Sequence, residues 1–189
     1  MTFKQRFDQK YKSDPNLFGR EPMPVLKEAL KYVSGGKALD LGVGNGRNAL
    51  YLLDNGFEVT GVDISEEGIK SLKQNLPEHA KIKLSVSDVA DYETDEKFDL
   101  ICAVGLLHFF DIQNIKKLIK KMKDYTKMGG INVIGAKMTQ NFRNDLPYVF
   151  KHKELKRFYT GKDWKIKYYK EIKRYRSKVA TIIALKKSL

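Results

Sequence analysis

The chain has little cysteine, tryptophan or proline: one, one and five among 189 residues. Because Cys102 is the only cysteine, neither a disulfide framework nor a cysteine-based zinc site can form within one chain. Cys102 lies in an apolar run, so we expect it to be a small buried core residue. We predict no metal site.

Long apolar runs are also missing. No run approaches the ~18 residues that a membrane-spanning helix requires. The first six residues, Met1 to Arg6, lack the apolar core of a signal peptide. Since 42% of the 189 residues are hydrophobic, the chain can bury a substantial core. These features predict one cytoplasmic domain that does not interact with membranes.

Acidic residues are scarce in the last fifth of the chain. Residues 151–189 contain 14 Lys and Arg against 3 Asp and Glu, so they carry +11 of the net charge of +13. This pattern has two interpretations. It indicates either a solvated, lysine-rich surface or a positive rim that attracts anions or nucleic acid.

Glycine is concentrated in one loop, where residues 40–46 read Asp-Leu-Gly-Val-Gly-Asn-Gly. Ala38 to Leu41 has the pattern of the end of a buried strand, and Arg47 to Asn55 has helical spacing. Strand, glycine loop and helix in this order are typical of the opening of a nucleotide-binding α/β unit. Glycine lets the backbone turn tightly and approach a ligand closely.

The residues around this loop exclude two phosphate-binding motifs. The dinucleotide fingerprint needs a glycine at position 47, and the phosphate-binding loop needs Lys and Ser or Thr where this chain has Arg47-Asn48. A carboxylate at Asp40 would repel a pyrophosphate but could hold an ammonium group. S-adenosylmethionine carries an ammonium group and no phosphate. Asp63, at the tip of a second predicted strand over 58–63, can accept hydrogen bonds from both ribose hydroxyls.

The run from Leu39 to Asp63 resembles class I S-adenosylmethionine-dependent methyltransferases. Within that class, Gly44-Asn45-Gly46-Arg47-Asn48 followed by Leu50-Tyr51-Leu52 is similar to the tellurite-resistance methyltransferase (TehB-like) family, and the resemblance covers about residues 35–189. It implies S-adenosyl-L-methionine as the cofactor. Together with the loop chemistry it gives a candidate cofactor site made of the glycine loop and three strand ends: Asp40, Gly42, Gly44, Asn45, Asn48, Asp63, Ile64, Asp88, Val89 and Val104.

The alternation of elements predicts an α/β fold. Further strands are expected over 82–86, 98–104, 131–136, 164–173 and 178–186. Helices are expected over about 65–75 and 112–125, the latter ended by Gly129-Gly130. We therefore expect a three-layer sandwich with a seven-stranded, mostly parallel, Rossmann-like sheet and right-handed crossovers. The resemblance implies that the last strand is antiparallel.

Residues 1–34 are predicted to form an N-terminal helical cap on a core of residues 35–189. Its helices are expected over 3–11, where positions 3, 7 and 11 share one face, and from Pro24 to about Tyr32. Tyr11 and Arg20 are candidates to face the site. The stretch from Lys137 to Pro147 follows a strand end and is predicted to form a wall of the substrate site.

Three residues are candidates for acting on the acceptor: His108, Arg174 and Arg176. The resembled family places a His-Arg pair and a further Arg between its last two strands, where this chain has Lys173-Arg174 and Arg176 but no histidine. The departure leaves a tellurium substrate undecided. His108 follows the fourth strand and is either catalytic or a structural histidine packed among apolar neighbours.

The predicted function is methyl transfer to a small acceptor of anionic, thiol or chalcogen type. Two alternatives remain open: an RNA or protein methyltransferase that uses the basic C-terminal region, and a non-catalytic protein that binds S-adenosylmethionine. A nucleic-acid partner is the weaker alternative, because the chain has no aromatic–basic platform for bases. The sequence identifies neither the acceptor nor the oligomeric state.

Overall fold

The computed structural model describes residues 1–140, 145–174 and 177–188, and of Arg174 it describes only the backbone. Arg176 therefore lies outside the described residues. The elements follow the chain in this order: α1 (Phe3–Ser13), α2 (Pro24–Ala29), β1 (Gly36–Leu41), α3 (Arg47–Asp54), β2 (Phe57–Asp63), α4 (Glu66–Lys73), β3 (Ile82–Val86), β4 (Phe98–Val104), a 3-10 turn η1 (Leu107–Phe109), α5 (Ile112–Tyr125), β5 (Thr126–Lys137), α6 (Glu154–Arg157), β6 (Trp164–Arg174) and β7 (Ser177–Lys186).

The strands form one seven-stranded sheet in the order β3-β2-β1-β4-β5-β7-β6. The pairs among β1 to β5 are parallel, and β7 lies antiparallel between β5 and β6. This arrangement confirms the predicted α/β fold and its antiparallel last strand. The chain order reverses between β1 and β4, and ligands of open α/β sheets bind beyond the carboxyl ends of the strands at such a point.

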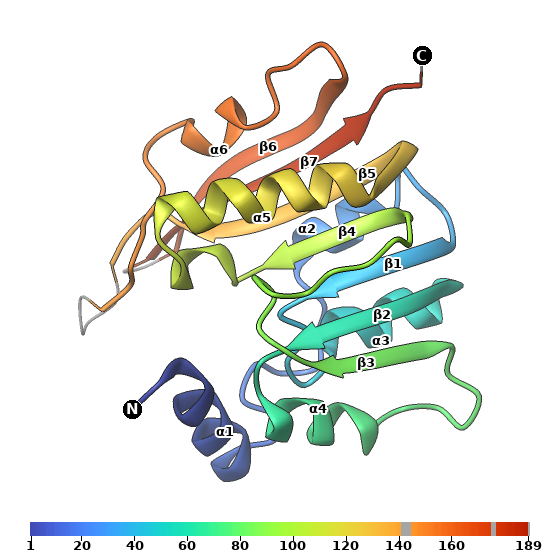
Figure 1. Ribbon diagram of the computed structural model, residues 1–189, viewed down its shortest axis with the longest axis vertical. Coiled ribbons are helices and arrows are strands. Elements are labelled where there is room, and N and C mark those ends of the chain that lie inside the picture. The colour runs from blue at the N-terminus through green and yellow to red at the C-terminus, as the bar shows by residue number, and fades with distance from the viewer. Residues whose placement is uncertain (141–144, 175–176, 189) are drawn as a thin grey trace.

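Helices cover both faces of the sheet. One face packs against α5 and the segment around α6, and the other against α2, α3 and α4. Figure 1 shows α5 in front of the sheet and α2 and α3 behind it, while α1 lies beside the start of α4, near the ends of β2 and β3. The three-layer architecture therefore leaves α1 at the edge where the parallel strands end.

Helix ends follow the local chemistry of the sequence. The Ser65 hydroxyl accepts from the Gly68 amide at 3.1 Å at the start of α4, and one Asp111 carboxylate oxygen accepts from the second and third amides of α5. Both caps are predictable from residue type. Thr2 and Gln5 form a capping box at the start of α1, which we did not predict.

Two predicted boundaries are wrong. The second helix ends at Ala29 rather than near Tyr32. Gly129-Gly130 lies within β5, because α5 already ends at Tyr125 and Thr126 is extended. The Thr126 hydroxyl donates to the Met122 carbonyl at 2.6 Å and closes the last turn, so the helix ends without a glycine.

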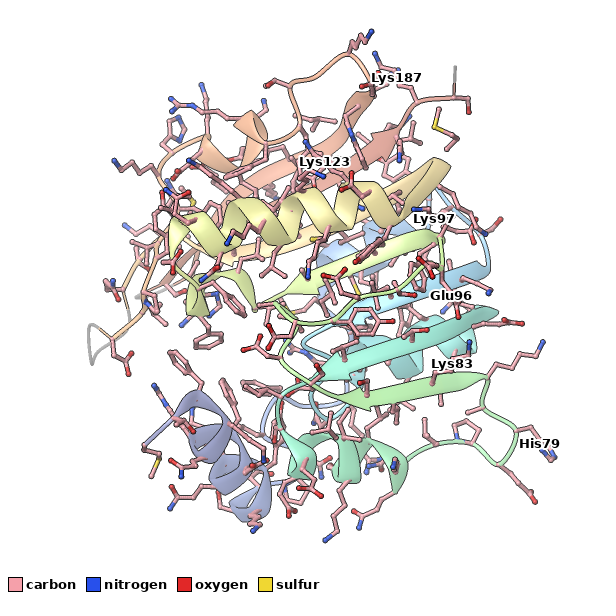
Figure 2. The ribbon with its side chains drawn as sticks, in the orientation of Figure 1. His79, Lys83, Glu96, Lys97, Lys123 and Lys187 are labelled. Atoms are coloured by element: carbon pink, nitrogen blue, oxygen red, sulfur yellow. The ribbon has the colours of Figure 1, made fainter. Side chains whose placement is uncertain are left out.

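Some of the chain's basic side chains contribute to the fold. Lys123, labelled on α5 in Figure 2, donates to the Phe158 carbonyl, and its ammonium lies 4.7 Å from the Tyr159 ring centroid. The lysines of β6 lie on a strand at the edge of the sheet. Exposed lysines on an edge strand oppose pairing with another chain.

Two further findings concern the expectations about apolar runs and about Cys102. None of the helices in the described part of the chain is long and apolar enough to span a membrane. Cys102 is buried within β4, as expected.

Gly46 tests the packing of the glycine loop. Its φ is +86°, and an added Cβ would lie 2.1 Å from the Leu72 Cδ1. We expect Gly46→Ala to lower the free energy of unfolding by about 2–4 kcal/mol in urea denaturation, through backbone strain and overpacking. Gly161→Ala is the control, because, apart from its two chain neighbours, no described residue has an atom within 4 Å of its added Cβ. Equal unfolding midpoints for the two variants would contradict this account.

Candidate functional site

A cavity of about 550 Å³ lies at the carboxyl ends of the parallel strands, where α1 and residues that follow β1 to β5 line it. Of the ten predicted cofactor residues, every one except Asp40 lines this cavity. We divide the cavity into two halves according to the strands at whose ends the lining residues lie. The glycine-loop half, at β3, β2 and β1, contains Gly42, Val43, Gly44, Asn45, Asp63, Ile64, Asp88 and Val89; the β5 half, at β4 and β5, contains Phe3, Arg6, Phe7, His108, Phe109, Phe110, Lys137 and Leu146.

Asp63 holds the glycine loop to the tip of β2. One of its carboxylate oxygens accepts from the Gly44 amide at 2.8 Å, and the other accepts from the Ser65 amide at 2.8 Å. Burial raises the pKa of Asp63, although these two backbone bonds oppose the shift. A carboxylate oxygen has two lone pairs, so each oxygen can still accept from a ligand hydroxyl.

Tyr11 of α1 covers this hydrogen bond, and its side chain is buried. A Cβ added to Gly44 would lie 2.3 Å from the Tyr11 hydroxyl oxygen, so glycine is the residue that allows α1 to approach the loop. Burial, and then the charge of Asp63, raises the pKa of the Tyr11 phenol. Tyr11 therefore lines the cavity as predicted, as a neutral phenol.

Asp40 lies beneath the loop and is 1% exposed. One carboxyl oxygen accepts from the Cys102 thiol at 3.1 Å, and the other has no hydrogen-bond partner among the described residues. Burial raises the pKa of Asp40 to about 7, and the charge of Asp63 adds to this rise. The carboxyl is therefore poised to ionise when a cation binds above the loop.

The side chains of Asn45 and Asn48 bind the N-terminal segment. The Asn45 amide donates to the Pro15 carbonyl at 3.2 Å, and the Asn48 carbonyl oxygen accepts from the Met23 amide at 3.1 Å. Both residues also line the cavity. They fix the chain that precedes β1 against the loop.

Asp88 and Val89 follow β3 at the far end of the glycine-loop half. One Asp88 oxygen accepts from the Ala90 amide at 2.9 Å, so the residue makes a local turn. Val89 is 5% exposed and Val104, at the end of β4, is 8% exposed. These two side chains give the cavity apolar walls.

His108 is 3% exposed and packs on Phe109, with the ring centroids 4.3 Å apart. Burial, and then the nearby charge of Lys137, lowers the pKa of His108 to about 3. Its Nδ1 has no hydrogen-bond partner among the described residues. The imidazole is therefore neutral at physiological pH and is a weak base.

The β5 half contains residues that the sequence reasoning missed. Phe3 and Phe7 of α1 each meet Phe109 edge to face, with centroids 5.3 Å apart. The Arg6 guanidinium, between them in sequence, pairs with the Asp145 carboxylate at 2.8 Å. The spacing of positions 3, 7 and 11 was visible in the sequence and could have indicated that this helix face covers the site.

The remaining candidates are Arg20, Arg174 and Arg176. Arg20 is exposed, donates to the Asn75 side chain at 3.3 Å and does not line the cavity, so its predicted position is wrong. Arg174 ends β6, and neither its side chain nor Arg176 is described; their roles stay predictions. Nowhere in residues 1–140, 145–174 and 177–188 do three His, Cys, Asp or Glu side chains cluster as a metal site requires.

Comparison with known proteins identifies the family. The tellurite resistance protein TehB family matches residues 4–180. This chain belongs to the TehB family. The match confirms the resemblance found in the sequence and extends it, because it starts within α1 rather than at about residue 35.

The curated TehB-family relative from Haemophilus influenzae is named a probable S-adenosyl-L-methionine-dependent methyltransferase. It is 34% identical over 175 residues, a match that covers 85% of this chain and 60% of that protein. The match thus spans less than two thirds of that relative's length.

Solved structures share the fold. The crystal structure of TehB from Haemophilus influenzae has a TM-score of 0.76 at 30% identity and covers 97% of this chain and 67% of that chain. The N-methyltransferase NodS of Bradyrhizobium japonicum, solved with S-adenosyl-L-homocysteine, has a TM-score of 0.79 and covers 97% of both chains. At 17% identity, the likeness to NodS shows the fold alone.

The pKa of Asp40 makes stability depend on pH. Its folded value of about 7 exceeds the ordinary value of 3.8, so between these values the folded chain binds a proton that the unfolded chain has released. The free energy of unfolding should therefore fall as pH rises through this window. Asp40→Asn removes this effect, and its stability relative to wild type should grow by a few kcal/mol between about pH 4 and pH 7.

Urea denaturation across this range measures the difference. The control is Asp95→Asn, at an exposed carboxylate, which should leave the pH profile unchanged. A constant difference between Asp40→Asn and wild type at every pH would show that Asp40 titrates normally.

Proposed function

We propose that the chain is an S-adenosylmethionine-dependent methyltransferase acting on a small acceptor of anionic, thiol or chalcogen type. One observation carries the proposal. The glycine loop, Asp63 and the Asp88-Val89 turn line one cavity across the ends of three neighbouring strands. Membership of the TehB family supports the same activity.

The residues of the glycine-loop half fit the cofactor. The unpartnered oxygen of Asp40 lies beneath the loop and would attract an ammonium group. Gly42 and Gly44 keep the loop free of side chains where the methionine end would lie, and Asp63 would accept from the ribose hydroxyls. Asp88 and Val89 would flank the adenine.

The cofactor supplies a methyl group activated by a positive sulfonium. The protein's main task is then to align the acceptor with that methyl group and to exclude water. Phe3, Phe7 and Tyr11 of α1 line the cavity, so this helix would provide the exclusion. The cavity continues past Val104 to Lys137, which supports a second binding site and thus an enzyme rather than a non-catalytic binding protein.

The chemistry of His108 favours one kind of acceptor. With a pKa lowered to about 3, the imidazole cannot retain a proton removed from an alcohol or an amine at physiological pH. Thiols and chalcogen acids ionise without strong base assistance and are nucleophilic once ionised. We therefore favour these acceptors, with His108 as a hydrogen-bonding partner.

An RNA acceptor has less support. Lys178 pairs with Glu171 at 2.9 Å, and the Lys186 ammonium donates to the Lys123 and Thr126 carbonyls. These charges serve the fold. The role predicted for Arg174 and Arg176 stays part of the proposal, as positive charge near the last hairpin, and a cytoplasmic location stays a prediction from the sequence.

Asp63 tests the proposed cofactor site. Asp63→Ala should weaken S-adenosylhomocysteine binding by about 1.5–3 kcal/mol for each hydrogen bond lost to the charged group. Asp63→Asn keeps one oxygen to accept from a backbone amide, so it should lose less affinity for S-adenosylhomocysteine than Asp63→Ala. Isothermal titration calorimetry gives the dissociation constants.

The control is Asp95→Ala, at an exposed carboxylate away from the cavity. Thermal unfolding checks that Asp63→Ala still folds, since the Gly44 and Ser65 amides lose their partner. If Asp63→Ala folds and binds S-adenosylhomocysteine with wild-type affinity, the ribose does not bind at Asp63. Wild-type protein that binds no cofactor would refute the proposed function itself.

A further inference from the structure

The β5 half of the cavity is chemically unlike the glycine-loop half. It is built by η1, the end of β5 and the first turns of α1. If the cofactor occupies the glycine-loop half, the β5 half is the space left for the acceptor. This inference rests on the proposed function and concerns what that acceptor must look like.

Three polar groups at this end have unused hydrogen-bonding or charge capacity. Lys137 lines the cavity and has no ion-pair partner among the described residues. The Arg6 Nε is buried without a hydrogen-bond partner there, although the guanidinium pairs with Asp145 through Nη1. The His108 Nδ1 likewise has no hydrogen-bond partner among the described residues, and His108 is only 3% exposed. The Arg6 charge is already met by the Asp145 carboxylate. The Lys137 ammonium, which acts electrostatically on the neighbouring His108, is therefore the charge at this end that suits an anionic group.

The rest of the β5 half is apolar and mostly aromatic. Phe3 and Phe7 present their rings around Phe109, and Phe110 and Leu146 complete the wall. An inorganic oxyanion would gain nothing from these surfaces, because it has no apolar area to bury. A flat hydrocarbon group would bury its faces against them and make edge-to-face contacts.

We propose that the acceptor is a small organic thiol with an aromatic or similarly apolar body. Its sulfur lies beside Lys137, and its body lies against Phe3, Phe7 and Phe109. Lys137 is the residue that selects the ionised thiol, because its charge favours the thiolate over the thiol. The aromatic wall distinguishes this acceptor from small inorganic anions.

The reaction balances without a further reagent. The thiol loses its proton to water on binding, since the buried imidazole is too weak a base to keep it. The thiolate sulfur supplies the electron pair of the new S–C bond to the methyl carbon. The old C–S bond breaks, and its electron pair stays on the cofactor's sulfur, which becomes a neutral thioether.

Transfer of labelled methyl groups from S-adenosylmethionine tests the acceptor class. The probes are phenylmethanethiol and 2-mercaptoethanol, two alkyl thiols of similar acidity, together with selenite and tellurite. We expect the KM of phenylmethanethiol to be at least about tenfold below that of 2-mercaptoethanol, because only the former fills the apolar wall. Selenite and tellurite should be the poorest acceptors.

Two variants locate the acceptor. Lys137→Met should raise the KM for phenylmethanethiol about tenfold or more by removing a charge-assisted contact, with the affinity for S-adenosylhomocysteine unchanged. The control is Lys116→Met, on the exposed face of α5, whose KM for phenylmethanethiol should equal that of wild type. Phe7→Leu should narrow the difference in KM between the two thiols.

The outcomes separate this inference from the proposed function. Protein that binds S-adenosylhomocysteine but methylates only selenite or tellurite, methylates the two thiols equally or methylates no thiol overturns the acceptor inference alone. An unchanged KM in Lys137→Met overturns the role of Lys137. Protein that fails to bind S-adenosylhomocysteine overturns the proposed function beneath both.

Discussion

The hydrogen bond from the Gly44 amide to the Asp63 carboxylate, at 2.8 Å, joins three parts of the molecule. It ties the loop after β1 to the tip of β2, and Tyr11 of α1 lies directly over it. Any side chain at position 44 would collide with Tyr11. The loop, the carboxylate and the covering helix therefore depend on one another, and the cavity exists because all three meet there.

The charges around this point are held in states that suit a cationic ligand. Burial keeps the Asp40 carboxyl partly protonated near neutrality, with one oxygen free of partners in the described chain. A positive group above the loop would favour its ionised form. At the other end of the cavity, burial and then the charge of Lys137 oppose protonation of His108 by lowering its pKa. The cavity thus has a buried carboxyl near one end and a lysine ammonium at the other, an arrangement that fits the proposed transfer from a sulfonium to an anionic nucleophile.

The sequence predicted the parts of the site that follow from local pattern. The glycine loop, the strand ends and the caps at Ser65 and Asp111 depend on residue types at fixed spacing, and the structure has them in place. The covering of the β5 half depends on where α1 lies, which long-range contacts decide: Asp8 accepts from the Ser65 hydroxyl at 2.7 Å, and Arg6 pairs with Asp145. Residue spacing within α1 does not specify those partners, so Arg6 was missed and Arg20 was misplaced. Lys137 was not missed, because it belongs to the stretch from Lys137 to Pro147 that the sequence predicted as a wall of the substrate site, and it lines the cavity.

The central claim is that S-adenosylmethionine lies along the ends of β1, β2 and β3 with its methyl group directed toward the β5 half. A crystal structure of the chain with S-adenosylhomocysteine tests it most directly. The account predicts ribose hydroxyls within hydrogen-bond distance of Asp63, the amino group above Gly42 and Gly44, and the adenine between Asp88 and Val89. A ligand bound elsewhere, or one with its adenine in the β5 half, would contradict it.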